Sequence, residues 1–364
     1  MKRLLSSLLA ICLLAGLDGC AMESPQGNES GLSASSRDFF AMNTYIRLEA
    51  YGDGAEDALA LAQTRVEELE GLWSVTDETS EIYAVNHSGG QPVSVSDDTA
   101  AVVSFALEMA EETGGALEPT IYPVLTAWGF TTDEHHVPSQ EEIDGLLASV
   151  DYRRVSVDGN TIQLEPDMML DLGAVGKGYA SDEVEELLRA EGVTSALLDL
   201  GGNIVMIGSR PDGSDWRLGL QNPFENDTVG VLTASDCAVV TSGNYENFFM
   251  ADDGTIYGHI IDPATGYPVH NDLTSVTIIA KDGKLCDALS TSLFVMGADS
   301  AIEYWREHPG FEMILITQDR QVFVTEGLEN QFRVTVASTA SEYPLADFRF
   351  RGTPAPKHEN CLLG

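Results

Sequence analysis

The sequence MLDLGAVGKGYASD, at residues 169–182, is the stretch around which the rest of the chain is organised. Its pattern predicts a short apolar strand at residues 168–170, a turn that contains Gly173, Gly176 and Gly178, and then a helix. Glycines let a backbone approach a ligand closely, and the N–H groups at a helix start attract anions. The stretch therefore has the features of an anion-binding turn.

Two charged residues accompany this turn, and they leave two interpretations open. Lys177 beside a glycine turn suggests a phosphate, and Asp171 lies six residues before it. A Walker A phosphate loop is excluded, because it needs glycine at position 171 and serine or threonine at position 178. A glycine-rich connection with a surface lysine is favoured while this stretch is considered alone. The helix that follows has an apolar face made of Tyr179, Val184, Leu187 and Leu188.

The composition favours a large folded protein with a strongly acidic surface. The 364 residues are 43% hydrophobic, which is enough for one large domain or two. The 58 acidic residues outnumber the 19 basic ones, and the formal net charge of −39 repels nucleic acids and anionic lipids. Such a surface suits a divalent cation, and no nucleic-acid partner is expected.

The N-terminus has the pattern of an export signal. Two basic residues precede an apolar run at residues 4–17, which is short for a transmembrane helix. The Leu-Asp-Gly-Cys sequence that ends at Cys20 resembles the lipobox of bacterial lipoproteins. We therefore expect a lipoprotein-type signal peptide at residues 1–19, a lipid anchor at Cys20 and a flexible tether at residues 20–36. An ordinary signal peptide and an uncleaved anchor are the alternatives. Each implies an exported protein that faces the periplasm or the cell exterior.

The five cysteines are scattered and odd in number, so they predict neither a disulfide framework nor a metal-ligand cluster. Cys237 and Cys286 lie in apolar surroundings and are expected to be buried thiols. The seven histidines are also dispersed, without an H-E-x-x-H pattern. No metal site built from these residue types is predicted.

No internal repeat and no long linker interrupts residues 37–350, which are expected to form the folded part of the chain, followed by a loose tail at residues 351–364. Long helices are expected at residues 55–72, 97–113 and 287–297. Two short helices are also expected, one at the end of the loop 73–86 and one that a capping box at residues 139–142 opens. Strands are expected at 39–51, 195–200, 203–208, 216–221, 229–234, 237–241 and 274–280, hairpins at 154–164 and 313–325, and an ordered loop at 114–130.

Asp287 and Thr291 are four residues apart at a predicted helix start, so they share one helix face. A carboxylate and a hydroxyl are hard oxygen ligands, which suit Mg²⁺ or Ca²⁺ rather than zinc. The alternative is that Asp287 is an N-cap or first-turn acid that matches the helix dipole. These two residues alone favour the alternative.

His259 is the histidine best placed for chemistry, at the end of a predicted short strand and before the sequence Ile-Ile-Asp-Pro. A base role requires a neighbouring hydroxyl from which it can take a proton. A lone histidine in such a position is more often structural. A Ser-His-Asp hydrolase is disfavoured, since the chain has no G-x-S-x-G motif.

The joint occurrence of these features, in order along the chain, resembles the ApbE family, the FAD:protein FMN transferases. The resemblance covers about residues 39–297, and each motif is weak while the ordered set is specific. The motifs are AMNT (41–44), SEIxxxN (80–86), GxLEPT (115–120), WGF (128–130), DLGAVGKGYASD (171–182), LGGN (200–203), TSGNY (241–245), HIIDPATG (259–266) and DALST (287–291).

The resemblance implies an α+β, T-fold-like domain in which mixed and antiparallel sheets are flanked by helices. It implies that Mg²⁺, or alternatively Ca²⁺, is held by Asp287, Thr291, the carbonyl of Ala174 and Ser290. It makes His259 the base of the transfer step. FAD would be lined by Met42, the loop near Thr76, the segment Ala116, Leu117 and Glu118, and by Asp171, Lys177 and Ile261.

The activity implied by the resemblance is Mg²⁺-dependent transfer of FMN from FAD to a serine or threonine hydroxyl, with release of AMP. The acceptor would be an exported or membrane flavoprotein subunit of the quinone reductase or Rnf type. Two rival functions stay open: an FAD pyrophosphatase that gives FMN and AMP, and a non-catalytic flavin-binding lipoprotein. The residues Asp287, Thr291 and His259 disfavour the second rival.

Overall fold

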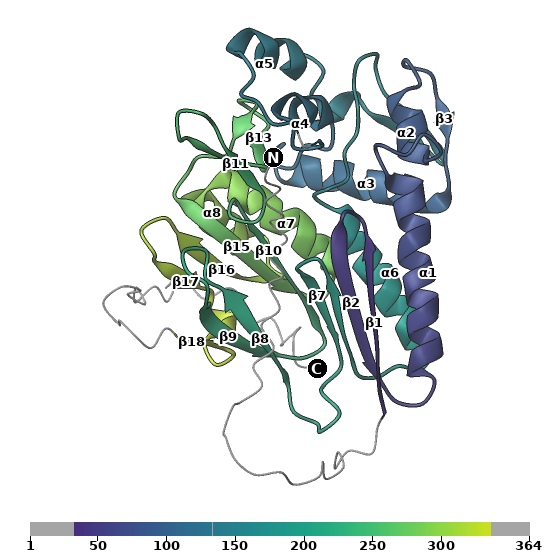
Figure 1. Cartoon of the computed structure of the whole chain (residues 1–364), viewed down its shortest axis with the longest axis vertical. Helices are drawn as coiled ribbons and strands as arrows, with labels where there is room; N and C mark the ends of the chain where they lie inside the picture. Colours follow the sequence, from purple (N-terminus) through teal and green to yellow (C-terminus); the bar gives the residue numbers. More distant parts are fainter. Residues whose placement is uncertain (1–32, 133, 336–364) are drawn as a thin grey trace, which may run out of the picture.

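The computed structural model describes residues 33–132 and 134–335, and its centre is an eight-stranded sheet (Figure 1). The strand order is β1-β2-β6-β7-β10-β15-β16-β17, and each neighbouring pair is antiparallel. The α+β class and the antiparallel pairing are thus confirmed, and no parallel pair occurs in the described ranges. These strands are β1 (Ala34–Ala41), β2 (Thr44–Tyr51), β6 (Ala196–Leu200), β7 (Asn203–Ile207), β10 (Cys237–Gly243), β15 (Leu273–Ala280), β16 (Glu312–Thr317) and β17 (Val322–Val324).

The two faces of this sheet bury two different cores, because side chains alternate along each strand. On β10, Ala238 and Val240 pack in the main core with the helices, whereas Cys237 and Val239 pack in a second core on the other face. A three-stranded sheet covers the second core, in the order β18 (Phe332–Val334), β9 (Thr228–Ala234) and β8 (Trp216–Gln221). Cys237 and Cys286 are buried free thiols, as predicted.

Helices cover the other face of the sheet and one end of it (Figure 1). Helices α1, α6 and α7 lie against the main sheet, and a third core around Trp128 joins α4 and α5 to short hairpins. The helices are α1 (Ala55–Trp73), α2 (Glu81–Asn86), α3 (Asp97–Glu112), α4 (Tyr122–Trp128), α5 (Gln140–Leu147), α6 (Gly176–Ala190), α7 (Gly283–Met296) and α8 (Ala298–Glu307), with short 3-10 turns at Tyr152–Arg154 and Glu326–Leu328. The short strands are β3 (Val93–Ser94), β4 (Ser156–Asp158), β5 (Thr161–Gln163), β11 (Phe248–Met250), β12 (Ile256–Gly258), β13 (Ile261–Asp262) and β14 (Tyr267–Pro268).

Five sequence predictions were wrong. The expected glycine turn is partly helical, because Gly176 and Gly178 lie in the first turn of α6. Residues 168–170 form no strand, because the side-chain amide of Asn86 bonds both the N–H and the carbonyl of Leu170, as a neighbouring strand would. The expected loop 114–130 contains α4. The single strand expected at 39–51 is the β1–β2 hairpin, so residues 34–36 belong to a strand and not to the tether.

The fifth error concerns α7, which begins at Gly283 and not at residue 287. Its first N–H groups are satisfied by another helix, because the Asp182 carboxylate on α6 accepts from the N–H groups of Gly283 and Lys284. Desolvation raises the pKa of Asp182 to about 6. Asp287 therefore lies in the second turn of α7, so its interpretation as a helix cap is excluded.

Glycine is required where α6 crosses α7. A Cβ atom at Gly178 would lie 2.4 Å from the Gly283 carbonyl oxygen and 2.6 Å from Asp287 Cβ. We expect Gly178→Ala to lower the free energy of unfolding by about 1–3 kcal/mol through overpacking. Gly71→Ala is the matched control, since Gly71 is also helical and has no atom within 4 Å of a built Cβ. It should raise stability by up to about 1 kcal/mol. Urea unfolding of both variants tests this, and an equal shift for both would contradict the tight crossing.

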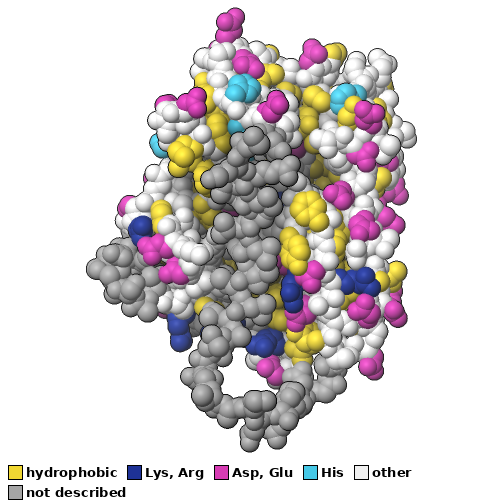
Figure 2. All heavy atoms as spheres, in the orientation of Figure 1, with side chains coloured by type: hydrophobic (Ala, Val, Ile, Leu, Met, Phe, Trp, Pro, Cys, Tyr) yellow, Lys and Arg dark blue, Asp and Glu magenta, His cyan; other side chains and the backbone are white. Residues whose placement is uncertain are grey.

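Two expectations fall wholly or partly outside the described residues: the signal peptide with its tether, and the tail 351–364. Within the described residues, no helix combines the length and the apolar character needed to cross a membrane. Acidic side chains are spread over the visible face of the molecule, and Lys and Arg are few (Figure 2). This distribution agrees with the formal net charge of −39.

Candidate functional site

The crossing of α6 and α7 brings together three groups that the sequence placed far apart. The Gly178 N–H donates to Asp287 Oδ2 at 2.8 Å, across 109 positions of sequence. In a regular helix this N–H would donate to the carbonyl of Ala174, as the Tyr179 N–H does to Val175 at 2.9 Å. Because the Gly178 N–H donates to the buried Asp287 carboxylate instead, the Ala174 carbonyl lacks its ordinary helical partner.

Hydroxyl groups from two elements lie next to Asp287. Ser290 Oγ donates to the main-chain carbonyl of Asp287 at 3.0 Å and lies 2.8 Å from Ser242 Oγ. Ser242, at the end of β10, is also 3.3 Å from Thr291 Oγ1. Asp287 and Ser290 are buried, whereas Ser242 and Thr291 are half-buried. Helix α7 and the end of β10 thus present oxygen atoms to one place.

The donor set at this crossing fits a hard divalent cation. In residues 33–132 and 134–335, no group of three or more His, Cys, Asp or Glu side chains can hold a metal. The groups available are one carboxylate, hydroxyls and the Ala174 carbonyl, all of them oxygen. Mg²⁺ is commonly held by one or two carboxylates together with substrate phosphates, rather than by a full protein cage. Asp287, Thr291, Ser290 and the Ala174 carbonyl are therefore suited to hold it.

Lys177 is the second residue of α6, beside this crossing, and lies among acidic groups. Desolvation raises the pKa values of Asp171 and Glu246, that of Glu246 to about 7. The positive charge of Lys177 opposes both shifts but is the smaller effect. Asp171 Oδ1 accepts from the Gly173 N–H at 2.8 Å. In the described ranges Lys177 has no ion-pair partner within 4 Å, so its ammonium group is available to an anionic ligand.

His259 is held with one ring nitrogen free for base chemistry. Its backbone N–H and its Nδ1 both lie near the Asn247 carbonyl oxygen, at 3.0 and 3.1 Å. A carbonyl only accepts, so Nδ1 carries the proton and Nε2 keeps its lone pair. Desolvation lowers the pKa of His259 to about 4, the Asn247 bond opposes this, and the charge of Lys177 lowers it further. The imidazole is consequently neutral near pH 7.

The pH profile follows from these values. If neutral His259 is the active form, the rate should stay level as pH falls through 6.5 and should halve only near pH 4, where the imidazole gains its proton. A stopped assay across pH 4–8, with folding checked by circular dichroism, measures this. An acidic limb near pH 6.5 would contradict the lowered pKa. A limb near pH 7 that vanishes in Glu246→Gln would assign control to Glu246 instead.

A cleft with a volume of about 510 Å³ lies beside the loop that precedes Asp171. Thr76 lines it together with Met169, and Thr76 is itself exposed. Aromatic and apolar side chains supply most of the remaining wall, which is suited to a planar ring system. The other lining residues are Val75, Tyr83, His87, Tyr122, Pro123, Thr126 and Leu146.

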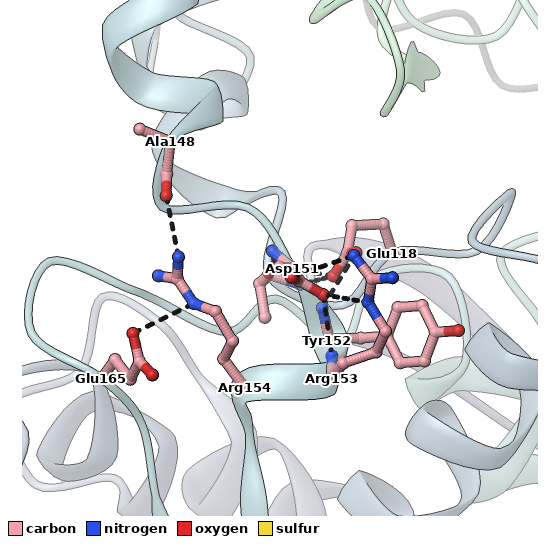
Figure 3. A network of polar contacts seen from close by, with 8 residues as sticks. Glu118, Ala148, Asp151, Tyr152, Arg153, Arg154 and Glu165 are labelled. Carbon is pink, nitrogen blue, oxygen red and sulfur yellow. Dashed lines mark hydrogen bonds and ion pairs between the residues drawn. The ribbon is translucent and has the colours of Figure 1, made fainter.

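The side chains at residues 116–118, which were predicted to contact the flavin, mainly contact other parts of the protein. Glu118 accepts from both the N–H and the hydroxyl of Thr120, at 2.9 and 2.6 Å, and from the Tyr152 N–H at 3.0 Å. Figure 3 shows this carboxylate within a network of Asp151, Arg153 and neighbouring residues. Leu117 is buried in the main core and Ala116 is half-buried. A ligand would meet this segment chiefly through its backbone.

The last two predicted flavin residues lie in the β1–β2 turn and at the start of β13. Met42 has a positive φ of 51° in the β1–β2 turn, and its N–H donates to Glu70 Oε1 at 2.7 Å. Ile261 is buried in the core around Trp128 and starts β13 directly after Ile260. The contacts of both with FAD stay predictions.

A model of the ApbE family matches residues 42–315, which includes the crossing, Lys177 and His259. The chain belongs to the ApbE family. It is 33% identical over 347 residues to a FAD:protein FMN transferase of Treponema pallidum, covering 89% of this chain and 94% of that protein. It is 32% identical over 309 residues to a FAD:protein FMN transferase of Vibrio cholerae, covering 82% and 89%.

Solved ApbE structures share the fold. The ApbE protein of Thermotoga maritima superposes with a TM-score of 0.77 at 30% identity, covering 81% of this chain and 98% of that one. The flavin transferase ApbE of Vibrio cholerae gives a TM-score of 0.72 at 26% identity, covering 84% and 97%. The predicted ApbE-type domain is therefore confirmed.

Two residues of the site were missed from the sequence. Ser242 contacts both Ser290 and Thr291, and Glu246 interacts electrostatically with Lys177 and Asp287. The motif TSGNY at residues 241–245 was the available signal for Ser242. It gave no chemical role, because only the pairing of β10 with β15 brings that segment to α7.

Proposed function

We propose that the protein transfers FMN from FAD to a serine or threonine hydroxyl of a partner protein and releases AMP. The observation that carries this proposal is the α6–α7 crossing. There Asp287 accepts the Gly178 N–H, which leaves the Ala174 carbonyl available. Lys177 and His259 lie in the same electrostatic neighbourhood. A site with one carboxylate, hydroxyls and one ammonium group suits a pyrophosphate better than a neutral substrate.

The protein residues have separate tasks in this reaction. A Mg²⁺ ion held by Asp287, Thr291, Ser290 and the Ala174 carbonyl would act as a Lewis acid toward the pyrophosphate. Lys177 binds the phosphate oxygens, where charge grows as the leaving group departs. The acceptor hydroxyl gives its proton to Nε2 of His259, and its oxygen forms a bond to the FMN phosphorus. The bond from that phosphorus to the bridging oxygen breaks, and AMP leaves with this oxygen.

The cleft of about 510 Å³ is proposed to hold a ring system of FAD. Tyr83 stacks on His87 with ring centroids 3.8 Å apart, and both line the cleft. Flat aromatic walls bind planar rings well, and the polar groups of Thr76 and Thr126 at the same cleft can fix the ring orientation.

A single assay separates transfer from its rivals. The protein is incubated with FAD, Mg²⁺ and a flavoprotein subunit of the quinone reductase or Rnf type, and the products are resolved by denaturing electrophoresis and chromatography. A fluorescent acceptor band with release of AMP supports FMN transfer. Free FMN and AMP without a labelled band support a pyrophosphatase, and unchanged FAD supports a flavin-binding lipoprotein.

The cellular setting is part of the proposal. The apolar run at residues 4–17 and the sequence ending at Cys20 support export and lipidation. An anchored transferase would meet acceptors at the same membrane, and the net charge of −39 would keep its domain away from anionic headgroups. Labelling with a radioactive fatty acid, lost in Cys20→Ala, tests the anchor.

A further inference from the structure

Beside His259 lies a second cleft, with a volume of about 410 Å³, that contains none of the predicted FAD or metal residues. Its walls come from β12, the segment around β14 and the start of β15. The lining residues are Asn244, Thr255, Ile256, Tyr257, Gly258, Pro268, Val269, His270, Leu273, Thr274 and Gln318. We propose that this cleft binds the acceptor polypeptide as an extended strand along β12, an inference that rests on the proposed transferase function.

The edge of β12 is available for such a strand. β12 pairs with β11 only, and neither strand pairs with a further strand in the described part of the chain. All three residues of β12 line the cleft in succession, which is what a strand presents along its edge and not along one face. Unpaired N–H and C=O groups on an edge recruit an extended peptide by β-augmentation.

Two buried polar atoms of this cleft lack partners. Asn244 Oδ1 and Thr274 Oγ1 are buried without a hydrogen bond, although Asn244 Nδ2 donates to the Val269 carbonyl at 3.1 Å. Leaving a buried polar group unsatisfied costs about 1–3 kcal/mol, so such atoms usually have a partner. A bound peptide offers both kinds, N–H donors for the Asn244 oxygen and carbonyl acceptors for the Thr274 hydroxyl, once rotation of these two half-buried side chains exposes the atoms.

The outer face of the β11–β12 hairpin adds an apolar surface that borders this cleft. Phe249 and Tyr257 point toward Trp128 on the inner face, with Tyr257 at 5.0 Å between ring centroids. On the outer face Phe248, Met250 and Ile256 are 49%, 67% and 62% exposed. Ile256 belongs to both the patch and the cleft. Apolar side chains that flank the acceptor hydroxyl would therefore contact this face.

The cleft is directly joined to the proposed base. Gly258 lines the cleft and precedes His259, while the next residue, Ile260, accepts from the Val269 N–H at 2.8 Å on the opposite wall. Adjacent Cα atoms are about 3.8 Å apart, so a peptide beside β12 reaches the imidazole within one or two residues of its own length. A peptide along β12 would thereby bring a serine or threonine hydroxyl toward Nε2 of His259.

The test uses beads that carry peptides of about ten residues, long enough for a strand, with a central threonine and randomised flanks. Wild-type protein, FAD and Mg²⁺ should produce fluorescent beads, mainly with apolar flanks, while alanine-centred beads stay dark. Ile256→Asp and Thr274→Val should each reduce labelling by about tenfold or more. Both should leave FAD binding, measured by flavin fluorescence titration, unchanged. Leu61→Asp is the matched control, because Leu61 is an exposed apolar residue on α1 with 48% exposure.

Backbone pairing is tested on the best-labelled peptide by methylating each of its backbone nitrogens in turn. A strand along β12 predicts loss of labelling at alternate positions, because alternate N–H groups face the edge. Equal labelling by Ile256→Asp, Thr274→Val and wild-type protein, or methylation without a period of two, would overturn the strand proposal alone. Wild-type protein that labels no bead and no flavoprotein subunit would overturn the transferase function and, with it, this inference.

Discussion

Asp287→Ala is expected to lower the rate of FMN transfer by about 10²- to 10³-fold. The carboxylate is buried, accepts the Gly178 N–H at 2.8 Å and is the one acidic group in the proposed Mg²⁺ set. Its loss removes the anionic ligand and leaves a buried N–H without a partner, which also costs about 1–3 kcal/mol of stability. The rate is measured with saturating FAD and a flavoprotein acceptor, over a range of Mg²⁺ concentrations.

The control for this variant is Asp282→Ala in the same helix. Asp282 is the N-cap residue of α7, and its side chain makes no capping hydrogen bond. It should therefore retain nearly full activity, while thermal unfolding shows whether Asp287→Ala is still folded. Excess EDTA should reproduce the defect in wild-type protein. A folded Asp287→Ala protein with normal transfer, or wild-type activity that persists in EDTA, would remove the crossing from the reaction.

His259→Ala is expected to slow transfer by about 10²- to 10⁴-fold while FAD binding is retained. Nδ1 is committed to the Asn247 carbonyl at 3.1 Å, and desolvation lowers the imidazole pKa to about 4, so Nε2 is an unprotonated acceptor at neutral pH. Without it the acceptor hydroxyl must lose its proton to water. Flavin fluorescence titration measures binding, and the labelled acceptor band measures transfer.

His308→Ala is the matched control for this second variant. His308 is also held through Nδ1 to a main-chain carbonyl, that of Tyr304 at 2.9 Å, but it is exposed at the end of α8. Its replacement should change neither binding nor transfer. If His259→Ala transfers FMN at the wild-type rate, another group takes the proton. If it loses FAD binding as well, His259 has a positioning role and not that of a base.

Regular elements were predictable where the local pattern agrees with the packing. Helix α1 follows the spacing of Leu59, Ala62, Val66 and Leu69, all of which are fully buried. The N-cap predicted before α5 is also present, since Ser139 Oγ accepts from the Glu142 N–H at 3.3 Å. These signals lie within one or two helical turns, so a single sequence contains them.

Two of the errors arose where a distant side chain replaces a local partner. The Asn86 amide occupies the hydrogen-bonding groups of Leu170, and the Asp182 carboxylate satisfies the start of α7. Neither partner is near in sequence, so no local pattern reveals them. The same is true of the site: the sequence supplied Asp287, Thr291 and Lys177, whereas only the packing of α6 on α7 shows why the Ala174 carbonyl is free.

The most direct measurement is the anomalous diffraction of a crystal grown with FAD and Mn²⁺ in place of Mg²⁺. The account predicts one strong peak within coordination distance of an Asp287 carboxylate oxygen and the Ala174 carbonyl, with the FAD pyrophosphate between it and Lys177. A peak elsewhere, or a pyrophosphate bound away from the α6–α7 crossing, would contradict the central claim.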